Sequence, residues 1–116
     1  MIAFTFEDQS FGKKKHPVPI AYEDIIVPAT GVVVNLTQEN MQKSVGALVN
    51  FENGPFRERH DGGVPVINAA SALASGYLRS SGDEYFFSRA EGKVFAVILD
   101  TTNGATEGML RVTYYG

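Results

Sequence analysis

Two histidines are the side chains in this sequence best suited to acid–base or metal chemistry. His16 follows three lysines, and His60 stands beside Asp61. Neither histidine shows the paired spacing of metal ligands, and the lysines before His16 would repel a cation. We therefore expect both histidines to be solvated loop residues, and we predict no metal site and no cofactor.

Serines and carboxylates are plentiful but form no catalytic pattern. The chain has no cysteine, which excludes thiol nucleophiles, thiolate metal sites and disulfides. A serine nucleophile would need a histidine base and an orienting acid, and no Gly-x-Ser-x-Gly elbow is present. The loop carboxylates have no spacing typical of a glycosidase: Asp61, Asp83, Glu84, Glu91, Asp100 and Glu107. We therefore predict that the protein is not an enzyme. A small hydrolase or a cupin-like enzyme is an alternative, which we place third after the two non-enzymatic hypotheses given below.

The most distinctive segment is a basic, proline-containing stretch from 7 to 24, which we expect to be an extended arm or long loop. Ordering such a segment costs about 1 to 2 kcal/mol per residue in backbone entropy, so we infer that a partner chain stabilises it. We expect further contacts from a second basic cluster, around Arg57 and Arg59, and from the terminal strand at 109–115. The predicted interaction residues are Lys13, Lys14, Lys15, His16, Pro17, Arg57, Arg59, Tyr114 and Tyr115.

Charge and hydropathy narrow the classes of partner. The formal net charge is −3, whereas proteins that recognise specific nucleic acids usually carry a basic surface. No apolar stretch approaches the length of a membrane span, and the first residues lack the pattern of a signal peptide. We therefore expect no specific nucleic acid and no membrane as a partner.

Short apolar runs separated by glycine, asparagine and proline predict β-strands throughout the chain. Residues 37–44 allow one helical turn, 56–63 read as a loop, and 68–76 as a helical turn or a loop. In the last strand, Leu110, Val112 and Tyr114 share one face. The expected strands are 2–6, 25–27, 31–36, 45–51, 64–67, 84–88, 93–99 and 109–115.

Turn signals about every ten residues are typical of an all-β fold. The hydrophobic fraction of 44% is enough for a packed core in one domain. We predict a single domain over 1–116, an antiparallel β-sandwich or jelly-roll-like barrel with an extended N-terminal arm at 7–24.

The absence of cysteine, the arm, the Gly/Asn-rich hairpins and a last strand ending at Tyr114-Tyr115-Gly116 give the chain a recognisable overall character. In this character it resembles the small β-sandwich or jelly-roll decoration (cement) proteins of tailed bacteriophages. The resemblance implies a non-enzymatic virion protein that stabilises a capsid. It also implies a homo-oligomer, a dimer or trimer, bound to the major capsid protein or another virion protein, where many copies of a modest interface give avidity.

A ligand-binding β-sandwich, such as a carbohydrate- or receptor-recognition module, is the main alternative. Its site would lie in loops 53–63, 79–84 and 100–107. Sugar binding would use aromatic platforms, whereas the structural reading places the phenylalanines in the core and the tyrosines at its edges. The possible platforms are Tyr77, Tyr85, Tyr114 and Tyr115.

Overall fold

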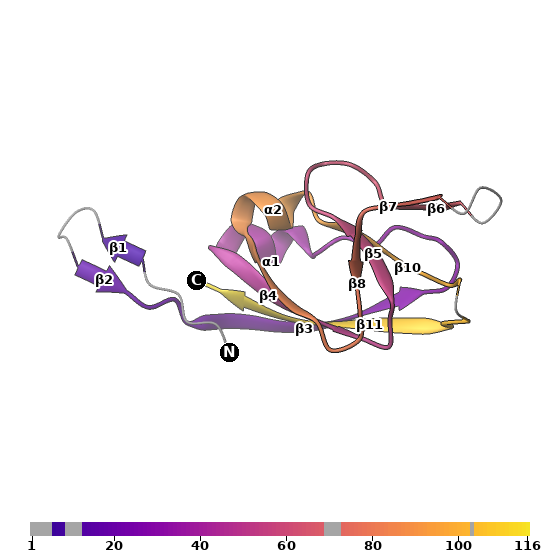
Figure 1. Cartoon of the computed structure of the whole chain (residues 1–116). Helices are drawn as coiled ribbons and strands as arrows, with labels where there is room; N and C mark the ends of the chain where they lie inside the picture. The colour runs from indigo at the N-terminus through magenta and orange to yellow at the C-terminus, as the bar shows by residue number, and fades with distance from the viewer. Residues whose placement is uncertain (1–5, 9–12, 69–72, 103) are drawn as a thin grey trace.

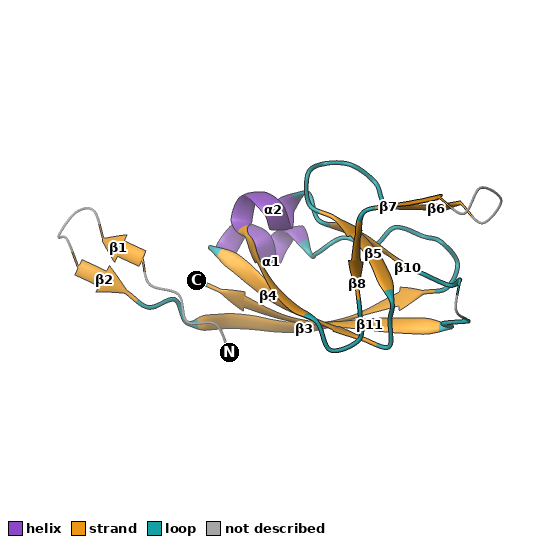
Figure 2. Ribbon diagram, viewed as in Figure 1, coloured by secondary structure: helices purple, strands orange, loops and turns teal. Residues whose placement is uncertain are grey.

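A four-stranded antiparallel sheet forms one layer of the molecule (Figures 1 and 2). The structure is a computed structural model that describes residues 6–8, 13–68, 73–102 and 104–116. The strands of this larger sheet, in spatial order, are β3 (Pro19–Pro28), β11 (Glu107–Tyr115), β4 (Gly46–Glu52) and β9 (Glu84–Ser88). β3 is therefore an edge strand, and β11 lies inside the sheet between β3 and β4.

A smaller antiparallel sheet packs on one face of the larger sheet. Its strands, in spatial order, are β10 (Ala96–Leu99), β5 (Phe56–Arg59) and β8 (Tyr77–Arg79). Side chains of both sheets meet in one core, which joins Phe56, Val97 and Leu99 to residues such as Phe51 and Phe87. The predicted all-β antiparallel sandwich is confirmed.

Alternation along β11 decides which side chains enter the core. Leu110, Val112 and Tyr114 are buried against the smaller sheet, whereas Met109 and Arg111 belong to the opposite face. A strand places successive side chains on opposite faces, so the predicted division of this strand is confirmed.

Two short helices close one end of the sandwich: α1 (Gln38–Lys43) and α2 (Arg89–Lys93) (Figure 2). α2 begins with a capping box, in which Ser88 and Glu91 each bond the backbone of the other. The helices approach closely because Gly92 has no side chain: a Cβ there would lie 2.4 Å from the Met41 methyl group. None of the helices in the described residues is long and apolar enough to cross a membrane.

Two hairpins extend from the sandwich. One joins β6 (Val66–Asn68) to β7 (Leu73–Ser75), and the other joins β1 (Phe6–Asp8) to β2 (Lys13–Lys15). The register of the β1–β2 hairpin places two acidic positions opposite two lysine positions. Figure 1 shows this hairpin standing clear of both sheets at one end of a molecule 56 Å long.

The segment 7–24, predicted as an extended arm or long loop, contains strands in the part that the structure describes, and its residues 9–12 lie outside the described residues. Residues 13–15 pair with 6–8, and 19–24 form the first part of β3, hydrogen-bonded to β11. Pro19 is compatible with this strand because it stands at its first position, where the missing N–H interrupts no ladder. What remains extended is the link at 16–18, and its end is fixed by two backbone hydrogen bonds between Val18 and Gly116.

Three other predicted segments differ from the structure. The β-branched run 31–36 is not a strand among the described residues. It forms a single antiparallel bridge, between Val34 and Val97. The charged run 56–63 begins with strand β5, since the charges there find partners inside the protein. Within 68–76, residues 73–75 form β7 and not a helical turn, and 69–72 lie outside the described residues, as does most of the strand predicted at 2–6.

Candidate functional site

The side of the larger sheet that points away from the core carries exposed apolar side chains. We call this side the outer face. On β3 its exposed fractions are 45% for Ile20, 75% for Tyr22 and 51% for Ile26, and Val18 continues the row just before the strand. Antiparallel sheets usually present polar side chains on a solvated face, so this row is unusual for a surface that stays in water.

An aromatic cluster extends the apolar surface across the other strands of the outer face. Phe86 of β9 lies over Gly46 of β4, where a Cβ would be 2.2 Å from the phenyl ring. The rings of Phe86 and Tyr115 are 6.5 Å apart. A groove of about 260 Å³ runs beside this cluster, lined by Pro19, Tyr22, Leu48, Asn50, Glu84, Thr113 and Tyr115.

A row of charges crosses the outer face next to the apolar cluster. Arg111 of β11 donates to Glu52 of β4 over 2.7 Å and lies 3.4 Å from Asp24 of β3. Arg111 and Asp24 stand at paired register positions, whereas Glu52 is paired with Met109 and so lies diagonally from Arg111. All three side chains remain about half exposed. The outer face therefore combines an apolar area with charges of both signs.

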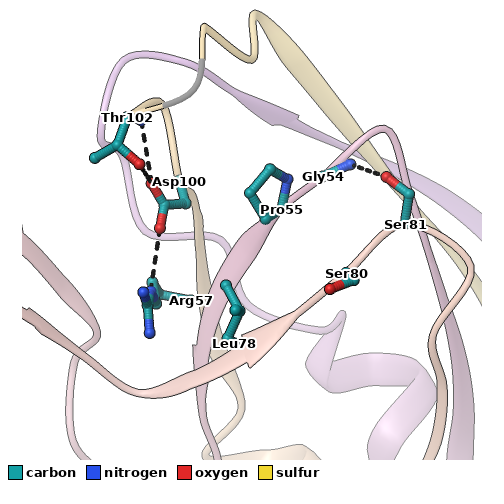
Figure 3. A pocket seen from close by; sticks show the side chains of 8 residues that line it. All are labelled: Gly54, Pro55, Arg57, Leu78, Ser80, Ser81, Asp100 and Thr102. Carbon is teal, nitrogen blue, oxygen red and sulfur yellow. Dashed lines mark hydrogen bonds and ion pairs between the residues drawn. The ribbon is translucent and has the colours of Figure 1, made fainter.

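A second site lies where three loops meet at the smaller sheet (Figure 3). Its volume is about 380 Å³, within the range of about 300 to 1,000 Å³ common for ligand pockets. Its lining comes from the three loop regions expected for a ligand site, together with the adjoining strand residues. We call it the Arg57 pocket, and it is lined by Gly54, Pro55, Arg57, Leu78, Ser80, Ser81, Asp100 and Thr102.

Asp100 organises one wall of the Arg57 pocket. Its carboxylate accepts hydrogen bonds from the Arg57 Nε at 3.1 Å and from the hydroxyl and backbone N–H of Thr102 at 2.6 and 3.1 Å. Burial alone would raise the pKa of Asp100, but the bonds from Thr102 and Arg57 outweigh burial and lower it. The pocket therefore contains an ionised carboxylate beside a guanidinium.

The most buried carboxylate of the described residues, Glu58, belongs to a separate charged cluster inside the sandwich. Glu58 of β5 is completely buried, and one of its oxygens accepts two bonds from Arg79 of β8, at 2.9 and 3.1 Å. Its other oxygen lies 2.9 Å from His60 Nδ1, and His60 Nε2 is 3.5 Å from Glu91 of α2. Every buried side-chain polar atom in the described part of the chain has a partner, which is typical of a structural network.

Aromatic rings enclose this charged cluster. The imidazole of His60 stacks on Tyr77, with ring centres 5.2 Å apart, and lies 5.7 Å from the ring of Tyr85. The Arg79 guanidinium lies 4.5 Å from the centre of the Tyr85 ring. Asp61, the neighbour considered for a metal site with His60, is instead paired with Arg59 at 2.7 Å, so the two side chains do not converge on one ion.

The predicted interaction residues are distributed over five parts of the molecule. Lys13, Lys14 and Lys15 form β2 of the projecting hairpin, followed by exposed His16 and half-buried Pro17. Arg57 lines the pocket, and Arg59 pairs with Asp61 on the surface. Tyr115 belongs to the outer face, whereas Tyr114 is fully buried and therefore part of the core.

The sequence analysis did not single out some residues of these sites. Ile20 and Tyr22 fell inside the segment expected to be an arm, so their alternation as strand residues was missed. The pattern Ile20-x-Tyr22 between two prolines was the available signal for an edge strand. Thr102 lies in loop 100–107 of the alternative ligand site but is not distinguished within it, because its role depends on the position of Asp100.

Comparisons of the chain with protein-family models, with curated proteins and with solved structures gave no match.

Proposed function

We propose that this protein is a non-enzymatic structural protein that self-associates and binds neighbouring protein subunits through the outer face of its larger sheet. The observation that carries the proposal is the row of exposed apolar side chains on β3: Ile20, Tyr22 and Ile26. Asp24 stands between Tyr22 and Ile26 on the same face, and apolar side chains bordered by charges are typical of protein interfaces.

The free-energy gain from covering this row supports an interface. Fully burying an isoleucine side chain contributes about 1.5 to 3 kcal/mol, and Ile20 and Ile26 are about half exposed. Tyr22 offers a larger gain, because most of its ring is exposed and tyrosine is enriched at interfaces. Three such side chains are a suitable centre for a modest contact that is repeated in many copies.

A second copy of the chain is the occupant that the charges of this face favour. Arg111 lies between the carboxylates of Glu52 and Asp24, so the outer face carries both signs of charge close together. In a two-fold contact the same patch meets itself, and a patch with both signs can then pair the arginine of one copy with a carboxylate of the other.

The edge position of β3 and the projecting hairpin offer further contacts to neighbouring subunits. The outer edge of β3 pairs with no strand of the described residues, and a free edge can accept a strand from another chain. A capsid shell is the assembly implied by the resemblance to phage decoration proteins, and its major capsid protein is the neighbour we propose.

The test is the molar mass in solution, measured by light scattering on a size-exclusion column. We expect the wild-type chain to be a dimer or trimer and the double variant Ile20→Glu/Tyr22→Glu to be a monomer of 12.6 kDa. Both side chains are exposed, so the variant should keep its circular dichroism spectrum. The matched control is Val32→Glu, an equally exposed apolar residue outside the outer face, which should leave the mass unchanged.

Two results would overturn the proposal. A wild-type chain that stays monomeric at the highest concentration reached would exclude self-association. An Ile20→Glu/Tyr22→Glu variant that is folded and keeps the wild-type mass would exclude the outer face as the contact.

A further inference from the structure

We propose that the Arg57 pocket binds a neutral sugar through Arg57, the hydroxyls of Ser80 and Ser81, and the carboxylate of Asp100. This binding site is separate from the assembly surface proposed above. The outer face belongs to the larger sheet, whereas Arg57 and Leu78 are paired residues of the smaller sheet, and the pocket opens beside them (Figure 3).

The walls of the pocket are held together before any ligand enters. The N–H of Asp100 donates to the carbonyl of Pro55 over 2.9 Å, and the N–H of Gly54 donates to the Ser81 hydroxyl over 2.8 Å. The N–H of Ser80 donates to the carboxylate of Asp83 over 2.7 Å. The first two bonds join the three loops, and the third shapes loop 79–84. A preformed site spends less of its binding free energy on ordering itself.

Unused donors line the pocket. Arg57 donates to Asp100 through Nε alone, and its two terminal nitrogens have no hydrogen-bond partner within the described part of the chain. The Ser81 hydroxyl accepts from Gly54, so its own hydrogen is free to donate. The Ser80 hydroxyl is likewise unused by the described residues.

Unused acceptors stand next to these donors. Asp100 Oδ1 accepts two hydrogen bonds from Thr102, but Oδ2 accepts only one, from Arg57, so one acceptor position remains there. The hydroxyl oxygen of Thr102 donates to Asp100 and keeps its lone pairs. Neighbouring hydroxyl groups of a sugar both donate and accept, and they fit an arginine beside a carboxylate.

The charge of the pocket favours a neutral ligand over an anion. Arg57 and Asp100 cancel each other at 3.1 Å, so an anion would gain from the guanidinium and lose to the carboxylate. Pro55 and the exposed side chain of Leu78 supply an apolar wall for the C–H face of a sugar ring. None of the tyrosines lines the pocket, and we therefore expect weak binding, with a Kd of roughly 1 mM.

The experiment is an NMR titration of the ¹⁵N-labelled full chain with glucose, galactose, mannose and N-acetylglucosamine, each added separately. We expect at least one sugar to shift the amide signals of 54–57, 78–81 and 100–102. The variant Arg57→Lys keeps the charge but loses the planar fork of donors, and it should weaken binding about tenfold. The matched control is Arg59→Lys on the same strand, whose arginine is also paired with an aspartate but lies outside the pocket.

The outcomes separate this proposal from its rivals. Equal weakening by Arg57→Lys and Arg59→Lys would overturn it, as would the absence of localised shifts with all four sugars. Titration with inorganic phosphate tests the anion alternative: tighter binding of phosphate than of any sugar at the same amides would overturn the assignment of a neutral ligand. The dispersion of each variant's spectrum shows whether it is folded.

Discussion

Burial of Tyr114 in the core changes the acidity of its hydroxyl. Its ring is fully buried in the core, and its hydroxyl donates to Glu23 over 2.7 Å. Burial raises the pKa of Tyr114 well above its usual value of 10.0, and the Glu23 carboxylate raises it further. The folded protein therefore keeps this proton at pH values where the unfolded chain releases it.

We predict that Tyr114→Phe lowers the free energy of unfolding by about 1 to 2 kcal/mol at neutral pH, because a hydrogen bond to a carboxylate is lost. The wild-type chain should lose stability as the pH rises above about 10, since only its unfolded state releases the Tyr114 proton there. Tyr114→Phe has no such proton to release, so the difference in free energy of unfolding between the two proteins should shrink as the pH rises. Urea unfolding at neutral and alkaline pH measures both effects.

The control for this prediction is Tyr77→Phe, which removes the hydroxyl of an exposed tyrosine outside the outer face. It should match the wild-type stability at both pH values. A Tyr114→Phe profile that runs parallel to the wild-type profile above pH 10 would contradict the linkage between Tyr114 and folding.

At the residue scale, the sequence singles out several residues that belong to sites or to the core, but it does not predict what each of them does. The sequence predicts Arg57 to be a contact residue of a basic cluster, and the structure places it in a pocket with Asp100. Tyr114 was selected as a contact residue, but alternation along its strand already assigned it to the face of Leu110 and Val112, which is buried. Glu58 lies in the predicted loop 56–63, and its burial does not follow from local sequence because a buried charge depends on partners from distant strands.

At the scale of elements, the Glu58 network connects four parts of the sandwich. Glu58 lies on β5 and Arg79 on β8, while His60 extends toward Glu91 on α2. The Arg79 guanidinium also lies over Tyr85 of β9 in the larger sheet. The smaller sheet is therefore held to the larger one by charges as well as by apolar packing.

We predict that Glu58→Ala lowers the free energy of unfolding by about 3 to 5 kcal/mol, because it leaves the mostly buried charge of Arg79 without its partner. Glu58→Gln keeps the shape and part of the hydrogen bonding, so it should cost less. Chemical denaturation followed by circular dichroism measures both. The control is Asp61→Asn at the exposed Arg59 pair, which should hardly change the midpoint; an equal loss there would contradict the importance of burial.

Strands with alternating or strongly apolar sequences were predictable, and segments whose pairing depends on tertiary context were not. The strand at 109–115 and the helical turn in 37–44 correspond to β11 and α1. The run 31–36 has the composition of a strand, but a side chain replaces part of its backbone pairing: the Asn35 amide donates to the carbonyl of Phe95. Composition alone does not show whether the backbone or a side chain will hydrogen-bond to the backbone of the neighbouring segment.

At the scale of the whole molecule, the two proposed surfaces belong to different sheets. The outer face lies on the larger sheet, and the Arg57 pocket lies at the smaller sheet. A sandwich has two outward sides, so an assembled copy can keep the pocket accessible. The projecting hairpin is a third feature, and an isolated two-stranded hairpin is only marginally stable in water. We expect it to be stabilised by a neighbouring subunit.

The boundary between hairpin and sandwich gives a direct test of this division. The two hydrogen bonds between Val18 and Gly116 fix the start of β3, and β3 pairs with β11 from Pro19 onward. We predict that deleting residues 2–17 leaves the unfolding midpoint nearly unchanged and weakens assembly. Deleting 2–24 removes the first part of β3 and should lower the midpoint strongly. Thermal unfolding and light scattering measure the two effects, and loss of cooperative unfolding in the 2–17 deletion would show that the hairpin stabilises its own domain instead of contacting a partner.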